Sequence, residues 1–189
     1  MPSDHRIDGR RGTPEARRRL HRLQRSRPVG GRTRDARGRL VRLDNVLAEI
    51  LAAHAYPSVI ERILAEALVL TALLGSSLKE KGSQLTLQTQ TEKGAIRLLA
   101  CDYKDGALRG YAQFDAATAA ALPRDATLFG VFGQGYLAIT FDRMKPASEG
   151  GGRYQGIVPL DGSSLEEIAG VYFRQSEQIP TKVRLGVAE

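Results

Sequence analysis

The side chains that most often carry out chemistry in proteins are scarce in this sequence, which has one cysteine and three histidines. The single cysteine, Cys101, excludes a disulfide within the chain and a zinc site built from several thiolates. The histidines are His5, His21 and His54, so an all-histidine site would have to bring distant segments together. Cys101 lies in a predicted strand, which favours a small buried residue, and a redox-reactive thiol is the alternative.

Other patterns that are associated with catalysis or cofactor binding lack the context that such chemistry needs. The glycines within residues 130–135 precede a predicted strand, whereas a dinucleotide-binding loop opens a helix. Asp102 and Asp105 are spaced as in an exposed turn, and Ser76 and Ser77 lack the flanking glycines of a nucleophile elbow. We therefore predict that the chain is not an enzyme and has no catalytic, cofactor-binding or metal-binding residues.

The elements that would position these residues follow from the spacing of apolar side chains. Apolar residues recur with a helical period from Pro57 to about Ser77, and beyond Glu66 they surround the helix, which predicts a central, covered helix. Expected helices cover 44–54, 57–77 and 163–176, with strands at 39–43, 84–91, 95–103, 107–114, 136–141, 153–160 and 181–187, a loop or short helix at 115–125 and a glycine-rich entry at 128–135. The short connections predict an α+β fold, in which a largely antiparallel sheet packs with the apolar central helix.

Charge divides the chain into two parts. Residues 1–39 hold 13 Arg and 4 acidic residues, a formal net charge of +9, whereas residues 40–189 carry −2. We predict that residues 1–36 are disordered, because Gly and Pro interrupt a segment with few apolar residues. An arginine-rich segment without lysine is typical of an out-of-frame or mis-started reading of a GC-rich gene, and a solvated tail and a nucleic-acid-binding arm are the alternatives.

A membrane span is not expected from this sequence. The longest apolar stretch, residues 60–74, contains Glu61, Arg62 and Glu66. We therefore expect a cytoplasmic protein with no membrane partner.

Several stretches of the chain together resemble one known family. They include QLTLQTQTEKGAIRLLACDY (84–103), RYQGIVPL (153–160) and YFRQSEQIPT (172–181), of which the last two are the most specific. Over residues of about 35–189 the chain resembles the N-terminal core domain of the redox-regulated heat-shock chaperones, the thirty-three-kilodalton chaperonin family. The resemblance predicts a core domain over residues 37–189 that follows the arginine-rich tail.

The resemblance implies an ATP-independent holdase of the stress response, which binds unfolded or misfolded client proteins through exposed apolar surface. Self-association, as a homodimer or as aggregate, is a separate expectation, because the apolar helix at 57–77 and an unpaired strand edge would recruit other chains. In that family a C-terminal domain binds zinc through four cysteines, and their oxidation activates the chaperone. None of these cysteines occurs here, and Cys101 matches none of them. We therefore expect a core without its C-terminal zinc switch, and neither a cofactor nor redox control. The alternative is a nucleic-acid-associated protein that acts through its basic tail, although we do not expect nucleic acid as a partner.

Overall fold

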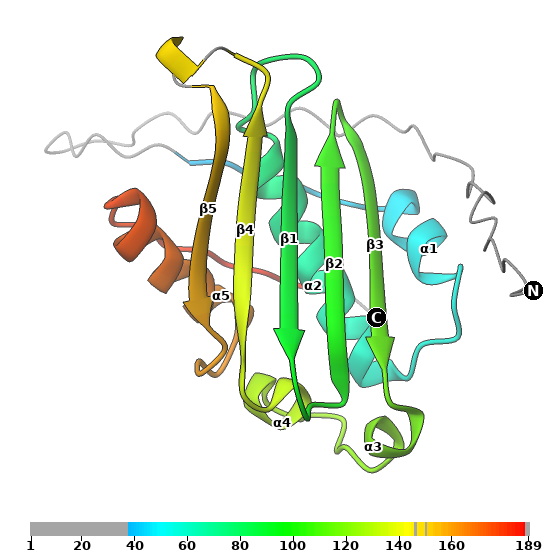
Figure 1. Cartoon of the computed structure of the whole chain (residues 1–189). Helices are drawn as coiled ribbons and strands as arrows, with labels where there is room; N and C mark the ends of the chain where they lie inside the picture. The colour runs from blue at the N-terminus through cyan, green and yellow to red at the C-terminus, as the bar shows by residue number, and fades with distance from the viewer. Residues whose placement is uncertain (1–37, 146, 150, 188–189) are drawn as a thin grey trace, which may run out of the picture.

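The computed structural model describes residues 38–145, 147–149 and 151–187, and it centres on a five-stranded antiparallel sheet (Figure 1). The strand order is β3-β2-β1-β4-β5, and every neighbouring pair is antiparallel. The strands are β1 (Gln84–Thr91), β2 (Ile96–Lys104), β3 (Ala107–Phe114), β4 (Gly135–Arg143) and β5 (Gly152–Pro159). The helices are α1 (Asn45–Leu51), α2 (Ser58–Gly75), α3 (Ala116–Ala120), α4 (Leu128–Phe132) and α5 (Leu165–Tyr172), with a 3-10 turn η1 (Ala147–Glu149) and a π-helical turn η2 (Phe173–Glu177). This arrangement confirms the predicted α+β fold.

The central helix is α2, as the sequence predicted. It packs against β1, β2 and β3 on one face of the sheet, behind the strands in Figure 1. Its residues are buried on several sides, and Ile60, Leu64 and Leu68 are fully buried. Burying a Leu or Ile side chain stabilises a fold by about 1.5–3 kcal/mol, so α2 is a principal source of the stability of the sheet.

Two segments that were predicted to be strands are extended but are not strands. Residues 38–43 and 179–187 cross behind α2 in Figure 1, and Val41, Leu43 and Val183 contact the core. A strand needs a ladder of backbone hydrogen bonds to a neighbour, and neither segment pairs with a strand in the described part of the chain. The prediction of strands at 39–43 and 181–187 was therefore wrong.

The other predicted boundaries shifted where capping residues outweigh the apolar pattern. The glycine-rich entry at 128–135 contains the short helix α4, because the Thr127 hydroxyl accepts a hydrogen bond from the amide of Gly130 at 3.2 Å. Helix α3 begins similarly at Asp115, whose carboxylate accepts from the amide of Thr118. The predicted helix at 163–176 is α5 followed by the π-helical turn. The tail predicted over residues 1–36 lies outside the described residues, as does the boundary of the core domain at residue 37.

No described helix combines the length and the apolar character that a membrane span requires.

Candidate functional site

One face of the sheet packs on α2, and the opposite face, which we call the open face, is covered by no other described element (Figure 1). The two faces alternate along each strand. In β1, Leu85 and Leu87 are fully buried on the α2 side, whereas Gln88 and Gln90 are exposed on the open face. A face that no described element covers over five strands is a broad surface available for binding.

The open-face side chains form rows across the sheet, because the five strands stay in register through these rows, and the shift between Ile96 and Leu98 in the β2–β3 pair lies beyond them. One row consists of Tyr111, Ala100, Gln88, Ala138 and Ile157. The next row consists of Gln113, Leu98, Gln90, Tyr136 and Pro159. No side chain in these two rows carries a formal charge, and we call them the uncharged rows.

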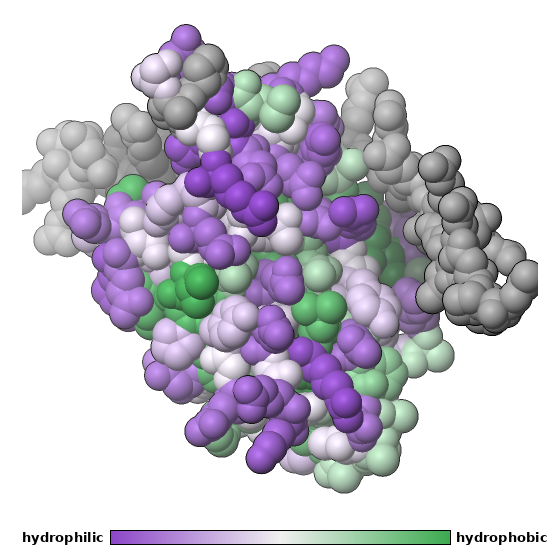
Figure 2. Space-filling model, in the orientation of Figure 1, coloured by the Kyte–Doolittle hydropathy of each residue, from purple (hydrophilic) through white to green (hydrophobic). Residues whose placement is uncertain are grey.

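Exposed apolar area lies at intervals within the uncharged rows. Tyr111 is 44% exposed, Tyr136 is 41% exposed and Ile157 is 56% exposed. The small side chains of Ala100 and Ala138 lie between the outer residues of the first row, and a row of five strands extends for about 19 Å at the usual strand spacing. Figure 2, drawn from the same side, shows separate hydrophobic areas on this face within polar surroundings.

Amide and hydroxyl groups lie between the apolar side chains. The Tyr136 hydroxyl donates a hydrogen bond to Gln90 Oε1 at 2.8 Å. The Gln88 amide, at the centre of the first row, has no hydrogen-bond partner among the described residues, so its donor and acceptor groups are available. The uncharged rows therefore offer apolar contacts and amide hydrogen bonds to a bound chain.

The charges of the open face lie in the rows toward the other end of the strands. The Asp102 carboxylate accepts hydrogen bonds from Thr86 Oγ1 at 2.5 Å and from Gln84 Nε2 at 3.2 Å, and it pairs with Arg109 Nε at 2.7 Å. The negative charge of Asp102 is therefore balanced by Arg109 on the neighbouring strand. On β2 and β3, the uncharged rows thus do not lie beside an unpaired acid.

The two edges of the sheet differ in how their backbone is covered. At the β3 edge, the Tyr56 hydroxyl accepts a hydrogen bond from the backbone amide of Ala112 at 3.2 Å, and the Tyr56 ring lies 5.9 Å from that of Phe114. The His54 ring contacts Tyr111 edge to face at 5.5 Å. The connection between α1 and α2 therefore covers part of the β3 edge.

No described strand pairs with the outer side of β5. The amide of Leu160 donates to the carbonyl of Gly135 at 3.0 Å. Since hydrogen-bonded positions alternate along an antiparallel pair, the backbone groups of Arg153, Gln155 and Ile157 point away from β4. These groups can accept a further strand.

The thiol of Cys101 lies on the α2 side of the sheet and is fully buried. Burial raises the pKa of this thiol, and a hydrogen bond with Thr71 opposes the effect only in part. The thiolate is the reactive form of cysteine, so this position supports the interpretation of Cys101 as a buried core residue. The alternative role as a redox-reactive thiol has no open path to solvent to support it.

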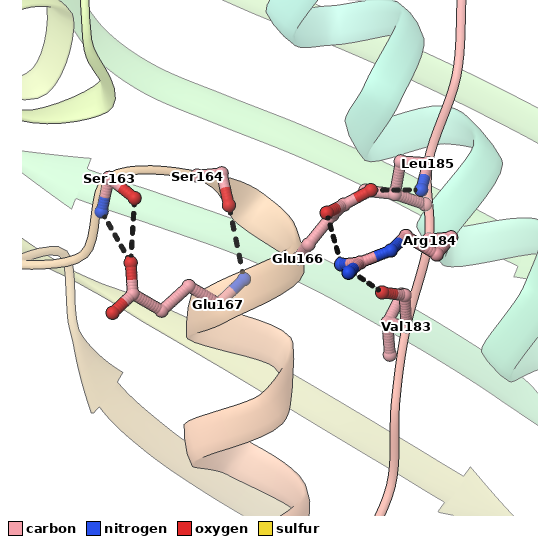
Figure 3. A network of polar contacts seen from close by, with 7 residues as sticks. All are labelled: Ser163, Ser164, Glu166, Glu167, Val183, Arg184 and Leu185. Carbon is pink, nitrogen blue, oxygen red and sulfur yellow. Dashed lines mark hydrogen bonds and ion pairs between the residues drawn. The ribbon is translucent and has the colours of Figure 1, made fainter.

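A network of polar contacts holds α5 and the last described segment in place (Figure 3). The Glu167 carboxylate accepts from the amide and hydroxyl of Ser163 at 2.8 Å, which lowers the pKa of Glu167. Glu166 lies on the other side of the helix, where it accepts from the amide of Leu185 at 2.5 Å and pairs with Arg184. These two adjacent acids therefore have structural roles, one at the start of α5 and one against the last described segment.

The described residues contain no cluster of three or more histidine, cysteine or acidic side chains that could hold a metal ion. The sequence showed the alternation of Leu and Gln in β1, but not the rows, because rows depend on the register of five strands. The turns at residues 93–94 and 105–106 could have indicated the register of β1 with β2 and of β2 with β3, but not that of β4 and β5.

Comparisons with known proteins agree with this structure. The model of the family described as Hsp33 protein matches residues 30–189. The 33 kDa chaperonin of Caulobacter vibrioides is 41% identical over 157 residues, which are 81% of this chain and 50% of that protein. The 33 kDa chaperonin of Shewanella sediminis is 41% identical over 152 residues, covering 80% of this chain and 49% of its own.

A solved structure gives the same result. The crystal structure of the 33 kDa chaperonin from Thermotoga maritima matches with a TM-score of 0.60 and 28% identity, over 74% of this chain and 47% of that one. The chain spans about half the length of these relatives. The family model covers most of the chain and the fold is shared, so this protein belongs to the Hsp33 family.

Proposed function

We propose that the chain is an ATP-independent holdase, which binds unfolded client proteins on the open face of its sheet. The observation that carries the proposal is the pair of uncharged rows, where Tyr111, Tyr136 and Ile157 are each about half exposed. Large side chains left exposed on one face of a sheet are typical of an interaction surface. The relatives are named chaperonins, which supports a binding rather than a catalytic role.

The chemistry of the uncharged rows suits an unfolded polypeptide rather than one folded partner. Apolar contacts are not directional, so Tyr111 and Ile157 can contact many different apolar side chains. The amide groups of Gln88 and Gln113 can hydrogen-bond to the backbone that every client shares. Separate small apolar areas bind weakly and reversibly, as a holdase that releases its clients requires.

Within this chain, redox control has a single thiol to act on. The sequence holds no cysteine besides Cys101, and this thiol is buried. We therefore expect client binding by this chain in the cytoplasm to be independent of redox state and of zinc. A second copy is the expected partner at the outer side of β5, since Tyr56 already covers part of the other edge.

The test is light scattering from a thermally unfolding client in the presence of the variant Tyr111→Thr/Ile157→Thr. Threonine keeps strand propensity but removes most of the apolar area. Each side chain is about half exposed, so we expect a loss of about 1.5 kcal/mol in total, or about ten-fold weaker suppression of aggregation.

The matched control is Gln155→Thr, which changes β5 on the same face, two residues from Ile157. We expect this control to suppress aggregation as the wild type does. Equal loss in both variants, or no loss in either, would assign client binding to another surface.

A further inference from the structure

The last described segment, residues 179–187, crosses behind α2 in an extended conformation, and we call it the strap (Figure 1). It follows Gln178, which ends the π-helical turn with a φ of 54°, a left-handed conformation that is costly for a residue with a Cβ. Val183 is buried in the core, and Leu185 packs against the same core. The strap therefore covers apolar surface, although no described strand pairs with it.

Glu166, in the first turn of α5, attaches the strap to the rest of the domain (Figure 3). Its Oε1 accepts a hydrogen bond from the amide of Leu185 at 2.5 Å, and its Oε2 pairs with Arg184 Nη1 at 3.0 Å. Among the described residues, no other hydrogen bond or ion pair joins residues 181–187 to a residue outside the strap. One carboxylate therefore provides the polar attachment of the strap.

The charged groups around Glu166 come from three elements. Arg184 belongs to the strap, Glu66 of α2 is a like charge near Glu166, and Glu167 faces the opposite side of α5. Burial raises the pKa of Glu66, Arg62 at 3.4 Å opposes this effect, and the charge of Glu166 adds to it. Protonation of Glu66 therefore only removes a like charge from the surroundings of Glu166. The contacts to the strap weaken when Glu166 itself takes up a proton.

We propose that Glu166 is an acid-sensitive clasp, whose protonation releases the strap and exposes a second apolar surface to clients. A protonated carboxyl group no longer attracts Arg184, and it accepts from the Leu185 amide more weakly, because hydrogen bonds to charged groups are the stronger ones. Release exposes Val183 and Leu185 together with the core surface that they cover. The second client surface rests on the proposed holdase function, whereas the clasp does not.

The attachment is weak enough to open without unfolding of the whole domain. The Arg184 side chain is 70% exposed, and an ion pair in such a position contributes little. Most of the polar attachment is thus the single hydrogen bond from the Leu185 amide. Acid also destabilises other proteins, because it protonates carboxylates that are paired in their folded states. The strap would therefore open under a condition that produces clients.

The experiment labels a buried position of the strap with a chromogenic disulfide reagent. The reporter is Cys101→Ala/Val183→Cys, and its rate is divided by that of Cys101→Ala/Lys182→Cys, because position 182 is exposed and reports the reactivity of a free thiol at each pH. At neutral pH, adding Glu166→Ala to both should raise this ratio by about 10-fold or more, as expected for the loss of a hydrogen bond to a charged group. At about pH 4, where glutamates take up protons, the ratio should rise similarly without that substitution.

The matched control is Glu167→Gln, which neutralises the adjacent acid and should leave the ratio and its pH response unchanged. An unchanged ratio in Glu166→Ala, an equal rise in both glutamate variants, or a rise at low pH that persists in Glu166→Ala would overturn the proposal. So would the absence of a rise at low pH. Rapid labelling of Cys101 in the wild type at the lower pH would assign the change to unfolding of the whole domain, which would also overturn it.

Suppression of client aggregation tests the second surface separately. At neutral pH, Glu166→Ala should suppress aggregation about two-fold better than the wild type, because the released strap adds a second apolar surface. This gain should persist when Tyr111→Thr/Ile157→Thr is also present, since those two positions lie on the open face. No gain in Glu166→Ala would overturn the second surface. The effect of Tyr111→Thr/Ile157→Thr alone concerns only the uncharged rows, so the two proposals fail or hold separately.

Discussion

Labelling of the single thiol tests the packing of the sheet on α2. Cys101 is fully buried between them, and burial raises the pKa of its thiol, so little thiolate forms at neutral pH. A reagent in solution can reach the sulfur atom only after the core opens. The labelling rate of the native chain therefore reports the free energy of that opening.

The size of the effect follows from the depth of burial. Opening the core of a small domain costs on the order of 5–15 kcal/mol. Every 1.4 kcal/mol is a factor of ten, so an opening cost of about 5 kcal/mol slows labelling by more than about 1,000-fold. We expect the labelling rate of the chain unfolded in urea to exceed that of the native chain by this factor. We also expect the chain to suppress client aggregation equally under peroxide and under reductant.

The assay follows the colour released by a chromogenic disulfide reagent. Its control is the variant Cys101→Ala/Gln155→Cys, which moves the one thiol to the open face and should be labelled at the rate of an exposed cysteine. A native wild-type chain that is labelled as fast as this control would refute the packing argument. Activation by peroxide that is absent in Cys101→Ala would make Cys101 a sensor.

Other variants test the edge, a partly buried carboxyl group and the core. Tyr56→Phe removes the hydrogen bond to Ala112, so urea unfolding should show a loss of about 0.5–1.5 kcal/mol, and sedimentation should show more self-association. Burial raises the pKa of Glu66 from its ordinary value of 4.5, and Arg62 opposes the effect. The protonated carboxyl group of Glu66 therefore stabilises the folded state. This contribution to the free energy of unfolding is fully present below pH 4.5 and is lost as pH rises through the folded-state pKa. The variant Glu66→Gln should remove this pH dependence from the midpoint of urea unfolding. Leu68→Ala leaves a cavity in the core and should cost about 2–5 kcal/mol in urea unfolding.

Specific results would contradict each of these expectations. Unchanged stability and assembly in Tyr56→Phe would mean that the β3 edge is not closed by this hydroxyl. A Glu66→Gln variant with the pH profile of the wild type would assign the titration to another group. Leu40 is exposed, so Leu40→Ala should change stability by less than about 0.5 kcal/mol, and an equal cost in both leucine variants would contradict the core assignment.

Local periodicity was enough to predict the central helix and the strands of the sheet. The predicted helix 57–77 corresponds to Ser58–Gly75, and the meander from residue 84 to residue 114 became β1, β2 and β3. These patterns are local, because side-chain spacing alone shows which face of an element is apolar.

What the sequence could not predict depends on partners that are distant along the chain. Residues 39–43 have the composition of a strand, but a strand also needs a neighbour, and none is present in the described part of the chain. The uncharged rows join Tyr111 to Ile157 only through the register of the strands between them. The role of Tyr56 at the β3 edge depends on a contact across 56 positions of sequence.

The unequal edges of the sheet also limit how copies of the chain can polymerise. A sheet with two open edges can add a neighbour on each side, and such stacking continues into a fibre. Here the Tyr56 hydroxyl already accepts from the amide of Ala112 and disfavours pairing at that edge, so we expect strand pairing at β5. Two copies joined through β5 would both use their open edge, so the assembly closes with two-fold symmetry and offers no site for a third copy.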